Sequence, residues 1–292
     1  MTTPIRHVLS LSGGKDSAAL AIHMRDRVPD MEYIFHDTDK ELPETIEYLH
    51  RLEAILGKKI TKTTSERSFD NWLKVYGGMI PSNHRRWCTK MLKLKPFERF
   101  VGSDTVHNDI GLRADEDRTG YISHKPNIVP IYPFRDEGLV LADIHQILED
   151  SGLGMPKYTD WGRTRSGCFF CFYQQKIEWV RLKENYPELY EEAKAYEVPN
   201  VINGNTFYWN GNESLAQLEM PERMDQIRDN WEIKRARMQE TKSSSIFWAW
   251  PNSKKNRLVV LFANCSSSRK VVGFYGLSDS GKNDTAARRR TD

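Results

Sequence analysis

The sequence lacks any apolar run long enough to cross a lipid bilayer. No stretch approaches the about 18 residues that a membrane-spanning helix needs, and the first residues do not have the pattern of a secretory signal. Internal repeats and sustained heptads are also missing, which argues against a solenoid and a long coiled coil. We therefore expect a cytoplasmic protein without a membrane partner.

Cysteine is scarce, with four residues among 292: Cys88, Cys168, Cys171 and Cys265. In a cytoplasmic chain, structural disulfides are rare. Cys168 and Cys171 form a Cys-x-x-Cys pair, whose spacing brings both sulfurs to the same side. Basic neighbours would favour thiolates and offset the negative charge of a thiolate-bound cluster, namely Arg85, Arg86, Lys90, Arg163 and Arg165.

Three interpretations of Cys88, Cys168 and Cys171 stay open on spacing alone. They can hold an iron–sulfur cluster with one iron left open, unless Cys265 or another group completes the set. Zinc, closed by a histidine such as His84, is the main alternative metal. Three thiols without a metal, two of them packed among phenylalanines, are the third interpretation.

The sequence contains one informative glycine-rich run, Ser12-Gly-Gly-Lys-Asp-Ser17. It follows an apolar segment typical of a strand and opens a segment with helical periodicity. Two glycines allow a sharp turn, and the helix N-terminus with Lys15 and two serine hydroxyls suits a polyphosphate. The spacing excludes a Walker A loop, because Leu9 stands where a glycine is needed and Asp16 replaces the Ser or Thr.

Strand-like and helix-like segments alternate through the first two-thirds of the chain. The pattern predicts an α/β fold with a doubly wound, mostly parallel sheet of five or six strands and helices on both faces. The expected strands cover about residues 5–11, 32–36, 59–63, 106–112 and 127–132, and the expected helices 15–24, 43–56, 89–100, 140–148, 174–196 and 221–241.

We expect three regions along the chain. They are an α/β domain at 1–165, a cysteine-bearing helical extension at 166–242, and a basic tail rich in Ser and Asn at 243–292. The tail holds nine Lys or Arg against three Asp, and it either contacts nucleic acid or is a solvated terminus. Residues 258–263 and 270–275 could form a hairpin, on which Trp248 and Trp250 either pack or present their rings to bases.

Five motifs in chain order resemble the phosphoadenylyl-sulfate reductase family of the ATP-pyrophosphatase superfamily, and the resemblance covers most of residues 5–175. In order, they are the loop Ser12–Ser17, Asp37-Thr38-Asp39 with Pro43-Glu44-Thr45, the segment from Cys88 to Pro96, Gly111-Leu112-Arg113, and Gly167-Cys168-Phe-Phe-Cys171.

Two departures from the family pattern weaken a reductase interpretation. Reductases of sulfate adenylates carry a Glu-Cys-Gly motif near the C-terminus, where this chain has Asn264-Cys265-Ser266. Cluster-bearing members have two adjacent cysteines where this chain has Trp87-Cys88. The intact loop is the form associated with ATP and pyrophosphate release, and the chain looks closest to the sulfur-activating subunit of bacterial DNA phosphorothioation systems.

The resemblance implies an ATP-dependent adenylating enzyme that inserts sulfur into nucleic acid and releases AMP and pyrophosphate. A sulfonucleotide reductase and a nucleotide-binding regulator without turnover are the alternatives. The implied cofactors are ATP, Mg²⁺ and an iron–sulfur cluster of the 4Fe-4S type, with zinc as the alternative metal. The implied partners are a nucleic-acid acceptor and a cysteine desulfurase or other sulfur donor, and a homodimer is one option for the assembly.

Specific residues follow from the matched motifs. Lys15 would stabilise charge on the departing pyrophosphate, Asp16 would help hold magnesium, and Arg113 would clamp a phosphate or pair at the surface with Asp115 or Glu116. The expected nucleotide-binding residues are Ser12, Gly13, Gly14, Lys15, Asp16, Ser17, Asp37, Thr38 and Asp39, and the expected metal ligands are Cys88, Cys168 and Cys171.

Overall fold

The computed structural model describes residues 5–199 and 204–248. The chain divides into two units, residues 1–241 and 242–292, and the account below concerns the first. Cys265, Trp250 and the expected hairpin at 258–263 and 270–275 lie outside the described residues. Within the described part, no helix combines the length and apolar character that a membrane crossing requires.

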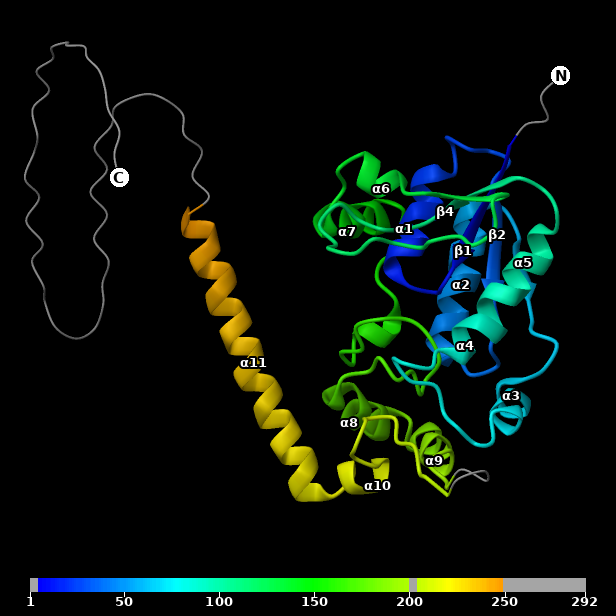
Figure 1. Cartoon of the computed structure of the whole chain (residues 1–292). Helices are drawn as coiled ribbons and strands as arrows, with labels where there is room; N and C mark the ends of the chain where they lie inside the picture. Colours follow the sequence, from blue (N-terminus) through cyan, green and yellow to red (C-terminus); the bar gives the residue numbers. More distant parts are fainter. Residues whose placement is uncertain (1–4, 200–203, 249–292) are drawn as a thin grey trace, which may run out of the picture. The chain divides into compact units, whose positions relative to one another are not determined.

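A parallel β-sheet forms the centre of the first unit (Figure 1). Among the described residues it has five strands in the order β3-β2-β1-β4-β5, and Leu9 pairs with Tyr33 on one side and with Asp109 on the other. The order reverses at β1, as at the switch point of doubly wound folds. The strands are β1 (Arg6–Leu11), β2 (Glu32–His36), β3 (Ile60–Thr63), β4 (Val106–Asp109) and β5 (Ile128–Ile131).

Helices cover both faces of this sheet. Side chains alternate along each strand, so the apolar side chains of a strand point to both faces and pack on the helices there. Leu9 and Leu11 of β1 lie in the buried cluster that includes α1 (Lys15–Met24), α2 (Pro43–Leu56) and α7 (Leu141–Asp150). Val8 lies in a separate cluster with α5 (Lys95–Val101). The predicted doubly wound α/β fold is therefore confirmed.

The helix expected at 89–100 is a composite. It consists of α4 (Trp87–Thr89), a π-helical turn η1 (Lys90–Leu94) and α5, and it follows α3 (Phe69–Val75). In the π turn, the N–H of Lys95 donates to the carbonyl of Lys90, five residues back. Pro96 has no N–H for the α-helical bond to residue 92 and its ring would clash with that carbonyl, so the helix widens just before it.

The helix expected at 174–196 is two helices, α8 (Lys176–Asn185) and α9 (Pro187–Ala195). Tyr186 leaves the helical conformation because the residue before a proline is biased away from it. The remaining elements are α6 (Pro133–Asp136), a 3₁₀ turn η2 (Lys157–Thr159), α10 (Leu215–Leu218) and α11 (Pro221–Trp248).

A third buried cluster joins the cysteine-bearing segment to earlier parts of the chain. Phe69, Trp87 and Phe170 belong to it, and the rings of Phe69 and Phe170 have centroids 4.5 Å apart. The segment around Cys168 and Cys171 is therefore packed on α3 and α4. This packing places it beside the carboxyl ends of the strands.

Candidate functional site

The glycine-rich run forms the turn between β1 and α1. Gly13 has a φ of +70°, and a Cβ built there would lie 2.3 Å from Cγ2 of Thr45, so the turn has no room for a side chain. Ser17 Oγ donates to the carbonyl of Gly14 at 3.1 Å and lies 3.1 Å from Ser12 Oγ. The first N–H groups of α1 lack helical partners, so this turn offers them to an anion.

Lys15, Asp16 and Arg113 form one charged group at this turn. The Asp16 carboxylate lies 3.0 Å from Lys15 Nζ and 2.6 Å from a terminal nitrogen of Arg113. Arg113 also donates from Nε to Asp115 at 2.8 Å. Burial alone would lower the pKa of Arg113, but its hydrogen bonds to Asp16 and Asp115 raise it. Arg113 thus contacts Asp16 of the loop as well as Asp115, the acidic neighbour expected for a surface ion pair. Its role as a phosphate clamp stays a prediction.

Two cavities open on the loop and share Ser12, Asp16 and Arg118 in their walls. The apolar cavity, of about 370 Å³, is lined on its apolar side by Phe35, Leu94, Phe97, Ile110 and Tyr121. The cationic cavity, of about 720 Å³, is lined on its basic side by Lys15, Arg86, Arg113, Arg118 and Arg165. An apolar pocket beside a cationic one can hold a molecule with a flat ring and several phosphates.

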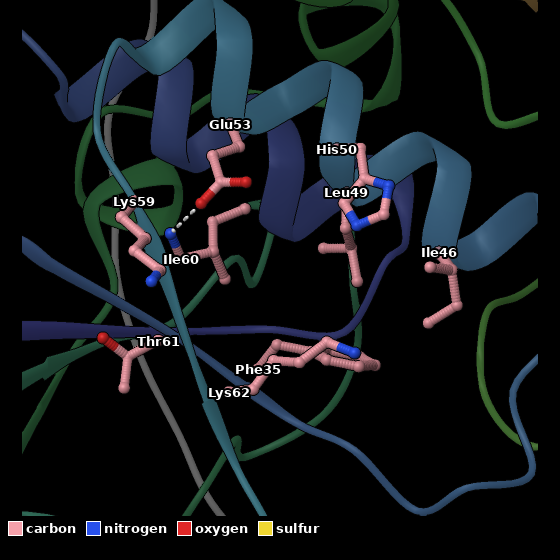
Figure 2. Close-up of a pocket in the computed structure, with 9 residues that line it drawn as sticks. All are labelled: Phe35, Ile46, Leu49, His50, Glu53, Lys59, Ile60, Thr61 and Lys62. Carbon is pink, nitrogen blue, oxygen red and sulfur yellow. Dashed lines mark hydrogen bonds between the residues drawn. The ribbon is translucent and has the colours of Figure 1, made fainter.

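A third cavity, of about 500 Å³, lies between α2 and β3 (Figure 2). Phe35, Leu49 and Ile60 contribute apolar surface, and Glu53 accepts the backbone N–H of Ile60 at 2.8 Å. It shares only Phe35 with the apolar cavity. Neither the glycine-rich loop nor a cysteine lines it, so it lies outside the candidate site.

The Cys-x-x-Cys segment lies directly against the loop. Ser166 Oγ donates to Ser12 Oγ at 3.2 Å. Beyond β2, Glu41 and Cys168 form an antiparallel bridge, and Cys168 Sγ lies 3.2 Å from Thr38 Oγ1. The structure therefore places the Cys-x-x-Cys turn beside the predicted nucleotide-binding loop. That Cys88, Cys168 and Cys171 bind a metal stays a prediction.

Lys93 lies between these two halves. It is carried by the π turn, its side chain is partly buried, and it lines the apolar cavity. Burial lowers its pKa, but the combined effect of Glu41 and the three cysteines Cys88, Cys168 and Cys171 raises it. The ammonium group of Lys93 therefore interacts electrostatically with all three cysteine sulfurs.

Arg163 holds the Cys-x-x-Cys turn from inside the protein. Only 1% of the residue is exposed, and its guanidinium donates to the carbonyls of Gly167 at 3.1 Å and Cys168 at 2.7 Å. Further bonds run to the carbonyl of Arg165 at 3.0 Å and to Gln174 Oε1 at 3.3 Å. From the sequence, Arg163 is only a basic neighbour of the cysteines, because no local pattern shows that its partners are backbone carbonyls.

The surroundings of Cys88, Cys168 and Cys171 are compatible with a metal or cluster that binds thiolates. Burial raises the pKa of the Cys88 and Cys168 thiols, so each needs a cation or a metal to ionise. Lys93 supplies one such charge, and Glu41 Oε2 is buried without a hydrogen-bond partner. Among the side chains described in residues 5–199 and 204–239, no three His, Cys, Asp or Glu already surround a metal position. Coordination would thus require side-chain adjustment.

The three residues of the segment Asp37–Asp39 make different contacts. Asp37 binds Lys62 Nζ at 3.0 Å and accepts the N–H of Asp39 at 3.0 Å, and Asp39 has a φ of +59°. Thr38 is buried and faces Cys168 rather than the apolar cavity. The residues of β2 that line that cavity are Phe35 and His36. A role for this segment beside adenosine therefore stays a prediction.

Sequence reasoning missed several contributors to the site, including Glu41, His36 and Ser166. Ser166 precedes Gly167-Cys168, and its position beside a recognised motif was the only available signal. Glu41 and His36 flank the Asp37–Asp39 motif, but their burial is a property of the packed structure.

Residues 6–130 match the family model of the phosphoadenosine phosphosulfate reductase domain. This segment is a domain of that family. The resemblance expected from the motifs is confirmed at this level. The matched residues include the loop, the Asp37–Asp39 segment, Cys88 and Arg113, while Cys168 and Cys171 lie beyond them.

Two curated relatives are uncharacterized proteins of Methanocaldococcus jannaschii. One is 28% identical over 199 residues and the other 25% identical over 236 residues. The alignments cover 63% and 75% of this chain but 40% and 53% of the relatives. The chain therefore spans about half the length of these relatives or less.

Solved structures with similar folds include the phosphoadenylyl-sulfate reductase of Candida auris in a phosphate complex. It has a TM-score of 0.46 and 16% identity, and the alignment covers 57% of this chain and 82% of that one. A U34-tRNA thiolase of Methanococcus maripaludis, solved with its 4Fe-4S cluster, has a TM-score of 0.40 and 15% identity over 67% of this chain and 72% of that one. The fold class itself rests on the observed sheet and the domain match.

Proposed function

We propose that the protein is an ATP-dependent adenylating enzyme that inserts sulfur into a nucleic-acid acceptor, in the manner of DNA phosphorothioation. The observation that carries the proposal is the direct contact of the cysteine segment with the loop, through Ser166 and Ser12, and with the residues after β2, through Cys168 and Thr38. An enzyme that only hydrolysed a nucleotide would have no need of three thiols beside its phosphate site.

The nucleotide half would bind ATP across the two cavities. The base would lie in the apolar cavity, and the phosphates would lie at the loop, held by backbone N–H groups and the hydroxyls of Ser12 and Ser17. Asp16 now holds Lys15 and Arg113 together. When MgATP binds, Asp16 would turn to the metal and release both cations to the phosphates, where Lys15 stabilises the departing pyrophosphate.

The reaction would proceed in two displacements. An acceptor oxygen attacks the α-phosphorus, the bond to the β-phosphate oxygen breaks, and pyrophosphate leaves. Hydrosulfide then displaces AMP, which carries the acceptor oxygen away. If the sulfur donor is a cysteine desulfurase, a thiol reductant would first supply two electrons to release its persulfide sulfur as hydrosulfide. No net electron transfer occurs, because the sulfur enters at the oxidation state of sulfide.

The cysteines would serve the second displacement. Cys88, Cys168 and Cys171 would hold an iron–sulfur cluster or, as the alternative, zinc, which would supply a binding site for sulfide. Lys93 would offset the negative charge of these thiolates and of the incoming sulfur. Arg163 would keep the turn that presents Cys168 in place.

A sulfonucleotide reductase is the second candidate, and the family of the matched domain favours it. Reduction of a sulfate adenylate to AMP and sulfite consumes two electrons. Cys168 and Cys171 could supply them by closing a disulfide and releasing two protons. The two candidates differ in their products, so a product assay separates them.

The test is to incubate anaerobically purified protein with MgATP, labelled oligonucleotides and sulfide, and to quantify AMP, pyrophosphate and incorporated sulfur. We expect AMP and pyrophosphate in equal amounts, and Lys15→Met should reduce their formation at least tenfold through loss of transition-state stabilisation. The exposed Lys59→Met is the matched control and should retain turnover, since Lys59 lines only the third cavity.

Other products would contradict the proposal. ADP and phosphate would indicate a different bond cleavage, and sulfite from a sulfate adenylate would select the reductase. Tight nucleotide binding without any product would indicate a regulator. For the sulfur half, an absorption spectrum and an iron assay on the same preparation are decisive, because a colourless, iron-free protein contradicts the cluster.

A further inference from the structure

Arg86 and Arg165 meet on one aromatic ring at the mouth of the cationic cavity. The guanidinium carbon of each lies 5.5 Å from the ring centroid of Tyr173. All three residues are exposed and line this cavity. A tyrosine ring attracts both cations and so holds two like charges near each other.

These two arginines differ from the other cations of the cavity. Lys15 and Arg113 pair with Asp16, and Arg118 pairs with Glu116. Among the side chains described in residues 5–199 and 204–239, neither Arg86 nor Arg165 has an acidic partner at ion-pair distance. The cavity therefore carries two uncompensated positive charges beside the loop, which an anion would neutralise.

We propose that Arg86 and Arg165 bind a backbone phosphate of the nucleic-acid acceptor, at a subsite separate from that of the ATP phosphates. The inference rests on the proposed function, because it names where that acceptor lies. Guanidinium groups are planar forks that match phosphate oxygens in pairs. The cavity of about 720 Å³ extends from Lys15 at the loop to Tyr173, so an acceptor phosphate held there would face the α-phosphate of ATP.

The surrounding sequence favours a polyanion over a small anion. Residues 71–97 contain no Asp or Glu but six Lys or Arg, and residues 161–177 also contain no acidic residue. The two stretches meet at Tyr173. Arg85 and Lys90, both exposed, continue the basic surface beyond the cavity, as a chain of phosphates requires.

The test is fluorescence anisotropy with labelled oligonucleotides of about 20 nucleotides, as single-stranded DNA, double-stranded DNA and RNA of one sequence. The double variant Arg86→Ala/Arg165→Ala should bind at least one probe about tenfold or more weakly than the wild type. The slope of log affinity against log salt should fall by roughly 0.7 to 0.9, which corresponds to one lost phosphate contact. MgATP affinity, measured by calorimetry, should stay within about twofold.

Two further variants sharpen the result. Arg67→Ala is the matched control, because the Arg67 guanidinium lies 5.3 Å from the ring of Trp72, outside both cavities beside the loop. It should keep wild-type binding. Tyr173→Leu retains both charges but removes the ring, and it should weaken binding by less than the double variant. The probe that loses most affinity tells whether the acceptor is DNA or RNA.

Several outcomes would overturn the inference. They are unchanged oligonucleotide affinity and salt slope in the double variant, absence of wild-type binding to all three probes, and a parallel fall in MgATP affinity. The same experiments distinguish failure of this subsite from failure of the proposed reaction. Oligonucleotide binding through these arginines without AMP formation keeps the subsite and removes the reaction, whereas AMP formation with no effect of the arginines does the reverse.

Discussion

At the scale of single residues, position in the packed structure decides chemistry that residue type leaves open. Lys93 and Lys95 are two residues apart in one basic segment. Lys95 is exposed, whereas Lys93 lines the apolar cavity and faces the three cysteines. A cation there can stabilise thiolates on one side and a bound anion on the other.

His36 gives a pH dependence that can be measured. It is 7% exposed at the end of β2, its Nδ1 lies 2.5 Å from Thr63 Oγ1, and burial together with the charge of Lys93 lowers its pKa to about 4. The unfolded chain binds a proton at this residue below about pH 6.5, and the folded protein does not until about pH 4. Stability is therefore lost as the pH falls through this window, by up to about 3 kcal/mol.

Urea unfolding at pH 7.5 and pH 5.0 checks this expectation. The variant His36→Asn cannot titrate, so its free energy of unfolding should fall by about 2 kcal/mol less between these pH values than that of the wild type. The exposed His124→Asn serves as the control and should follow the wild-type profile. Identical pH profiles for the wild type and His36→Asn would show that His36 does not contribute.

At the scale of elements, the Cys-x-x-Cys turn depends on a side chain that it surrounds. Residues 165–174 contain little regular structure, and Arg163 donates to the carbonyls of Arg165 and Gly167. It also adds a second donor to the carbonyl of Cys168, which accepts the N–H of Cys171. Gln174 adds a bond from its amide to the carbonyl of Phe169 at 2.6 Å. The turn is thus organised by buried polar groups as well as by apolar packing.

Replacing Arg163 by Met keeps the length of the side chain but removes its donors. The free energy of unfolding should fall by about 3 kcal/mol or more, because the carbonyls of Arg165 and Gly167 lose their donor and Gln174 Oε1 loses the guanidinium. Alkylation of Cys168 by iodoacetamide, followed by mass spectrometry, should become faster in the folded protein. Arg165→Met removes an exposed neighbour and should leave both measurements near wild type. Equal stability of the two variants would argue against this role of Arg163.

The elements themselves were largely predictable, whereas their side-to-side contacts were not. The five strands were expected near their observed positions, and the turn at Ser12–Ser17 follows from two glycines between a strand and a helix. The π turn depends on how Pro96 alters one helix, and the pairing of Glu41 with Cys168 joins segments far apart in the chain. Local pattern carries no signal for such pairings, so the link between loop and cysteines required the structure.

At the scale of the whole described unit, the strand order explains why one site can have two halves. The order reverses at β1, so the loop after β1 lies where a crevice opens at the carboxyl ends of the strands. The cysteine segment comes from the C-terminal part of the chain and reaches this crevice through the bridge at Cys168. A ligand bound at the loop should therefore change the reactivity of the cysteines.

This coupling can be tested by ligand-dependent thiol labelling. MgATP at about 100 times its dissociation constant should raise the free energy of unfolding by about 2.7 kcal/mol. It should also slow alkylation of Cys168 and Cys171, mapped by mass spectrometry, because Ser166 ties their segment to Ser12. Ser166→Ala should bind MgATP with similar affinity but lose most of the protection. If MgATP leaves the labelling rates of the wild type unchanged, the two halves act independently and the contact between them is only structural.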